Sequence, residues 1–147
     1  MNAGRPAFVV HDLDHAVGAL RAAAEAGVAV TLWSAPGAAS YAGLGFLRGI
    51  LEQAREAVPE ACHDVVIDCA DSGVLAHEAL SRGFAGVAFT GRGAMRNTLQ
   101  AIADAEGTRL VTAGPGRAAL DLVQSIDPER DSAAYLAKSP KRTVRQS

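Results

Sequence analysis

The chain has 147 residues, of which 49% are hydrophobic and 20% are charged, and its formal net charge is −2. Such a composition is typical of one globular domain, and the length is sufficient to bury a sizeable core. A net charge this close to zero gives no indication of a basic surface for nucleic acid or for anionic lipid. We therefore expect neither nucleic acid nor a membrane among the partners.

Cysteine content and the first residues indicate a cytoplasmic protein. Cys62 and Cys69 are too few for a disulfide framework, which favours a reducing compartment. The N-terminal stretch MNAGRPAF lacks the apolar core of a signal peptide. The uncharged stretch 26–47 is long enough for a membrane span, but Pro36 and Gly37 lie in its middle. A buried strand, a loop and the start of a helix fit it better.

Short apolar runs alternate with helical stretches along the chain. Strands are expected at 7–11, 28–33, 64–69, 86–90 and 109–112. Helices are expected at 14–27, 40–58, 72–83 and 93–107, with a last one at 117–126. Gly27, Gly83 and Gly107 stand where helices commonly end in a left-handed residue.

This alternation predicts an α/β fold with a parallel sheet. The strands are nearly continuous in apolar residues, which indicates that both faces of the sheet are covered. We expect βα units in a three-layer, flavodoxin-like arrangement with strand order 2-1-3-4-5, and the open half of a (β/α) barrel is the alternative. Residues 127–147 are polar, so we expect a tail after a domain of residues 1–126. Tyr135 and Leu136 could dock that tail on the domain.

Acidic residues gather where the first and third strands are expected to end, in HDLDH and CADSG. Ligands of open α/β sheets bind at the carboxyl ends of the strands. In the order 2-1-3-4-5 these two strands are neighbours, so that the carboxylates could converge on Mg²⁺, which prefers oxygen ligands. The candidate metal ligands are Asp12, Asp14, Asp68 and Asp71. The alternative is that these acids cap helices.

Two glycine-rich stretches, TGRGAM at 90–95 and TAGPGRA at 112–118, each follow an expected strand and open an expected helix. Free N–H groups at a helix start attract anions, and arginine binds phosphate or carboxylate through two parallel hydrogen bonds. The stretch 86–118 resembles the phosphate site in the last two units of phosphate-binding (β/α)₈ barrels. The residues expected to bind an anion are Thr90, Gly91, Arg92, Gly93, Gly114, Gly116 and Arg117.

The sequence also excludes several chemistries. Both lysines, Lys138 and Lys141, lie close to the C-terminus, which excludes a Schiff-base enzyme with a lysine in its core. The absence of a GxxxxGK[ST] motif excludes a P-loop. GLGFLRG at 43–49 imitates a dinucleotide fingerprint but lies within an expected helix, where the fingerprint does not function.

Three functions are compatible with these patterns. The leading one is a module that binds a small phosphorylated or carboxylated molecule at the carboxyl ends of the strands. The second is a metal-assisted hydrolase or lyase acting on a phosphorylated substrate. The third is a non-catalytic regulatory or assembly protein that forms a homo-oligomer through the 41–58 helix, whose apolar arc of roughly 160° is wider than one sheet contact needs. The motifs do not favour an enzyme over a binding module.

Overall fold

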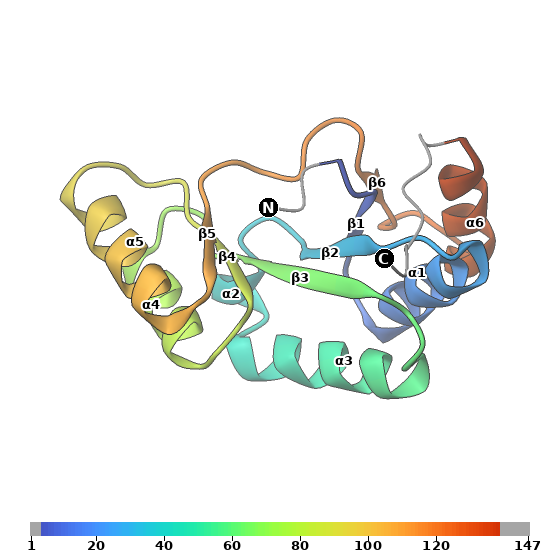
Figure 1. Ribbon diagram of the computed structural model, residues 1–147, viewed down its shortest axis with the longest axis horizontal. Helices are drawn as coiled ribbons and strands as arrows, with labels where there is room; N and C mark the ends of the chain where they lie inside the picture. The colour runs from blue at the N-terminus through green and yellow to red at the C-terminus, as the bar shows by residue number, and fades with distance from the viewer. Residues whose placement is uncertain (1–3, 139–147) are drawn as a thin grey trace.

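The computed structural model describes residues 4–138, which contain a parallel sheet of six strands (Figure 1). Five strands follow the expected apolar runs: β1 (Ala7–Val10), β2 (Val30–Ser34), β3 (His63–Asp68), β4 (Gly86–Ala88) and β5 (Arg109–Val111). The sixth, β6 (Leu120–Asp121), lies in a stretch for which the sequence predicts a helix. All the strand pairs are parallel.

Helices connect the strands from β1 to β5. They are α1 (Leu13–Ala26), α2 (Ala38–Tyr41), α3 (Leu44–Ala57), α4 (Gly73–Ser81) and α5 (Ala94–Glu106), and α6 (Pro128–Lys138) follows β6. The predicted 40–58 helix is divided into α2 and α3, because the backbone leaves the helical conformation at Gly43, where φ is 91°. Gly27 and Gly107 end α1 and α5 in the left-handed conformation, as predicted.

The strand order in the sheet is β5-β4-β3-β2-β1-β6. The predicted α/β class with a parallel sheet is confirmed, and the alternating helices are consistent with a flavodoxin-like three-layer fold. The expected order 2-1-3-4-5 is wrong, because each crossover from β1 to β5 joins neighbouring strands and β2 lies between β1 and β3. Sequential order of this kind is also that of (β/α) barrels. A hydrophobic pattern indicates that a strand is buried but not which strand lies beside it, so it does not distinguish the two orders.

Two apolar clusters form the core. One gathers around Phe8, Leu20 and Leu32, and the other around Trp33 and Phe89. Every residue of β1 and β2 is buried, which confirms that both faces of the sheet are covered there. In Figure 1, α1 and α6 lie side by side at one end of the sheet and α4 and α5 at the other. The segment between β5 and β6 passes over the sheet on the side away from α3 (Figure 1).

Residues 128–138, predicted as part of a polar tail, form α6, which packs against α1. Leu136 is buried, and the Tyr135 ring meets Phe8 edge-on with the ring centroids 5.1 Å apart. These two side chains therefore dock on the domain, as their apolar character suggested. The rest of the predicted tail, 139–147, lies outside the described residues.

The stretch 117–126 does not form the predicted helix. Leu120 and Asp121 instead pair with Phe8 and Val9 at the edge of the sheet, and Leu122 is fully buried. Hydrogen bonds to β1 and the burial of Leu122 outweigh the weak helical preference of the segment.

The uncharged stretch 26–47 contains β2, α2 and the first turn of α3, as its central proline and glycine indicated. It is thus divided among several short elements. Among residues 4–138, none of the helices combines the length and the hydrophobicity needed to cross a membrane.

Candidate functional site

The loop after β4 carries the first group of predicted site residues to the carboxyl edge of the sheet. Thr90 is exposed, and its N–H donates to the carbonyl oxygen of Ala70 at 2.8 Å. This bond holds the loop beside the turn that precedes α4. Met95, in the first turn of α5, lies against Gly73, the first residue of α4. The starts of α4 and α5 are therefore neighbours at this edge.

The start of α5 has no side-chain cap. Gly93 occupies the N-cap position with φ at 74°, a conformation that favours glycine, and it offers no side-chain acceptor to the first turn. By contrast, Asp12 accepts the N–H of His15 at the start of α1, and Ser72 accepts the N–H of Leu75 at the start of α4. The first N–H groups of a helix carry partial positive charge. At α5 these groups are left for water or a ligand.

Two arginines flank this helix start. Arg92 is exposed and forms no hydrogen bond or ion pair within residues 4–138. Arg96 donates from Nε to the carbonyl oxygen of Gly91 at 3.1 Å. This bond fixes its guanidinium over the loop and leaves the two terminal nitrogens for another acceptor. No Asp or Glu occurs from residue 79 to residue 103, so no acid on this stretch neutralises the pair.

Arg96 was not among the predicted site residues. The signal that could have found it is its spacing, because it lies three residues after the glycine that opens α5. A side chain at that position is in the first turn of the helix, close to the free N–H groups.

The second predicted loop does not open a helix. The segment 112–119 instead connects β5 to β6, which lies at the opposite edge of the sheet. The carbonyl oxygen of Ala118 accepts a hydrogen bond from the Tyr135 hydroxyl at 2.7 Å, and the same hydroxyl accepts the N–H of Ala7 at 3.4 Å. Arg117 therefore lies near the start of β1. Gly114 and Gly116 are exposed along the crossing segment.

Arg92 and Arg117 are consequently far apart across the sheet. Arg92 follows β4, whereas Arg117 precedes β6, and three other strands lie between those two. The two glycine-rich stretches do begin on neighbouring strands, β4 and β5, as expected. The second of them then leaves the region, so its arginine does not join the α5 start.

The four predicted metal ligands do not gather. Asp12 caps α1, Asp14 and Asp71 are exposed, and Asp68 ends β3, which β2 separates from β1. Among residues 4–138, no group of three or more His, Cys, Asp or Glu side chains is arranged to hold a metal ion. Asp12 therefore has the alternative role, that of a helix cap. At the start of α4 the cap is Ser72 and not Asp71.

Asp68 connects the ends of two strands. Its Oδ1 accepts the N–H of Gly37 at 3.1 Å and the N–H of Ala70 at 2.8 Å, and its own N–H donates to Ser34 Oγ at 2.8 Å. Burial, with the charge of Asp68 adding to it, raises the pKa of the neighbouring Cys69 thiol to about 12. The thiolate is the reactive form of cysteine, so Cys69 packs as a protonated, structural side chain.

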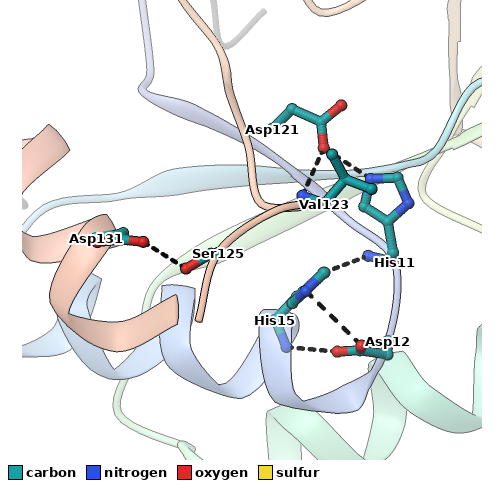
Figure 2. A network of polar contacts seen from close by, with 7 residues as sticks. All are labelled: His11, Asp12, His15, Asp121, Val123, Ser125 and Asp131. Atoms are coloured by element: carbon teal, nitrogen blue, oxygen red, sulfur yellow. Dashed lines mark hydrogen bonds and ion pairs between the residues drawn. The ribbon is translucent and has the colours of Figure 1, made fainter. Parts of the chain in front are cut away.

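Figure 2 shows a polar network at the carboxyl ends of β1 and β6. His11 Nε2 lies 2.7 Å from Asp121 Oδ1, which also accepts the N–H of Val123. His15 Nδ1 accepts the N–H of His11 at 3.0 Å, and His15 Nε2 lies 3.7 Å from Asp12 Oδ2. The network fastens β6 and the start of α1 to β1. Asp121 was not among the predicted site residues, because the sequence pattern at 117–126 is that of a helix.

Comparison with known proteins finds no matching protein family and no matching curated protein. The function is therefore inferred from the geometry of the chain. The starts of α2, α3 and α5 have no side-chain cap, and the start of α5 is flanked by Arg92 and Arg96.

Proposed function

We propose that the protein binds a small phosphorylated or carboxylated molecule at the start of α5. The observation that supports this proposal is an uncapped helix start flanked by Arg92 and Arg96, with no acid on the surrounding stretch. Two positive side chains beside unsatisfied N–H groups create a local positive potential. This positive potential attracts a negatively charged ligand to the start of α5.

Each group has a distinct part in binding. The anion accepts hydrogen bonds from the first N–H groups of α5, where the helix dipole favours negative charge. Arg92 and the terminal nitrogens of Arg96 add charge-assisted hydrogen bonds. Gly91 and Gly93 have no side chains that would keep the ligand away from the backbone. This arrangement selects for charge and shape and requires no metal ion.

A thermal-shift screen tests the proposal. Inorganic phosphate, phosphorylated metabolites and small carboxylates are added to the wild type, to Arg92→Gln and to Arg96→Gln. Arg21→Gln, which removes an exposed arginine of α1, is the matched control for the loss of one charge. A ligand at 100 times its Kd stabilises the protein by about 2.7 kcal/mol, which raises Tm by several degrees.

We expect a shift in the wild type and in Arg21→Gln, and its loss in the two other variants. Equal shifts in all the proteins, or no shift with any of the anions, would contradict an anion site at α5.

A second candidate function is self-assembly through residues 41–58. Tyr41 and Phe46 are 69% and 58% exposed, and aromatic side chains are enriched in protein interfaces. If this face joins two copies, Phe46→Glu should reduce the molar mass measured by light scattering from dimer to monomer. Val74→Glu, at an exposed apolar position of α4, should leave the mass unchanged. A monomeric wild type excludes this candidate.

A further inference from the structure

A pocket of about 300 Å³ lies at the amino-terminal end of the sheet, away from the start of α5. It lies between α3 and the residues that begin β3 and precede β4. The start of α5 follows the carboxyl end of β4, at the opposite end of the strands. The apolar part of its wall consists of Leu51, Val65, Phe84 and Ala85. The volume is at the lower end of the range for small-molecule sites.

Most charged groups around the pocket already have partners. Arg48 pairs with Glu52 at 3.5 Å, donates to the Arg82 carbonyl oxygen, and lies over the Phe84 ring with Cζ 4.5 Å from its centroid. Asp64 accepts from the Thr31 hydroxyl and pairs with two further arginines at 3.4 and 3.2 Å. Arg48 and Phe84 thus form a fixed wall, and the charge of Asp64 is neutralised.

Arg55 is different from these groups. It lines the pocket and makes no hydrogen bond or ion pair with any residue from 4 to 138. Its charge reaches the neighbouring His63 imidazole, whose pKa is lowered mainly by burial, with Arg55 acting in the same direction. His63 is therefore neutral at physiological pH and adds no second positive charge to the pocket. One unpaired guanidinium at the edge of an apolar pocket is complementary to one anionic head group.

We propose that this pocket binds a small monocarboxylate with an apolar body. The apolar body packs against Leu51, Val65 and Phe84, and the carboxylate accepts hydrogen bonds from Arg55. A single carboxylate suits the single unpaired arginine, and an apolar chain suits the apolar part of the wall. This pocket is separate from the start of α5, so the two proposals can be tested independently.

An NMR titration of the full chain with octanoate tests the proposal, with octan-1-ol and octylammonium as neutral and cationic analogues. We expect octanoate to shift the amide signals of Val65, Phe84 and Ala85, and to bind more tightly than either analogue. Arg55→Gln should weaken octanoate binding by about tenfold, because a charge-assisted hydrogen bond is lost, and should not affect octan-1-ol. Ala85→Phe, which adds bulk at an exposed position of the wall, should weaken both.

Arg21→Gln is again the matched control and should bind octanoate like the wild type. The proposal is overturned if octanoate does not bind, if it shifts other amides, or if Arg55→Gln retains wild-type affinity. Inorganic phosphate, which has no apolar part, should not shift the pocket amides. A phosphate response at Gly93 without an octanoate response here would support the α5 site and reject this one.

Discussion

The two cysteine thiols of the chain differ in their exposure to solvent. Cys69 is 1% exposed and burial raises its pKa to about 12, whereas Cys62 is exposed. Because the thiolate is the reactive species, we expect an aromatic disulfide reagent to modify Cys62 rapidly and Cys69 only after unfolding. Mass spectrometry of peptides from native and denatured protein measures this difference. Equal modification of both thiols in the native protein would contradict the burial of Cys69.

Asp12 tests whether the HDLDH stretch is a helix cap or a metal site. Replacement of Asp12 by Ala removes the acceptor for the His15 N–H, and should lower the free energy of unfolding by about 1 kcal/mol. Asp14→Ala, at an exposed position in the same turn, should change it by less than about 0.5 kcal/mol. Urea unfolding with and without Mg²⁺ measures both effects. A wild type that Mg²⁺ stabilises, and an Asp12→Ala variant that it does not, would restore the metal hypothesis.

His63 makes stability depend on pH in a defined direction. Burial lowers its pKa from 6.5, assisted by the charges of Arg55 and Arg5 and opposed by the Ala61 carbonyl and Asp64. The unfolded chain then binds a proton more readily than the folded one, so stability falls as the pH decreases below about 6.5. His63→Gln should flatten this dependence, which urea unfolding across the range measures. His77→Gln, at an exposed position, should leave the dependence as it is in the wild type.

At the scale of the elements, the contact between α1 and α6 depends on a glycine. A Cβ at Gly18 would lie 2.7 Å from Glu129 N and 2.8 Å from Pro128 Cβ. Gly18→Ala should therefore push α6 away and destabilise the protein by about 1 to 3 kcal/mol. Gly49→Ala in α3, where nothing lies within 4 Å of an added Cβ, should instead stabilise by about 0.5 to 1 kcal/mol. Equal responses would show that α6 is not packed closely on α1.

The local sequence pattern predicted correctly those strands and helix ends that depend on their own residues rather than on distant ones. The apolar runs at β1, β2 and β3 are strands, and Gly27 and Gly107 end helices, because burial and left-handed geometry leave a direct trace in the sequence. Residues 117–126 carry a helical pattern, yet Leu120 and Asp121 join the edge of the sheet. That outcome depends on β1, which is remote in sequence, and so a local pattern cannot predict it.

At the scale of the whole molecule, strand order determines which predicted residues meet. Arg92 and Gly93 belong to one loop, and their neighbourhood could be predicted from the sequence. Asp12 and Asp68 were expected to converge, but β2 lies between their strands, and Arg117 was carried to the far edge by the crossing segment. The sequence pattern of a strand–helix–strand unit is the same whether the second strand pairs on one side of the first or on the other. The sequence therefore predicted that these loops lie at the carboxyl ends of the strands, but not which of their residues are neighbours there.

The most direct test of the α5 site is an NMR titration of the full chain with inorganic phosphate. We expect saturable shifts of the amide signals of Gly93, Ala94 and Met95, since the proposal places the anion against their N–H groups. We also expect a Kd about tenfold weaker in Arg96→Gln, where one charge-assisted contact would be lost. Shifts confined to residues 112–119, or amide signals at the α5 start that do not respond at any concentration of phosphate, would contradict the account.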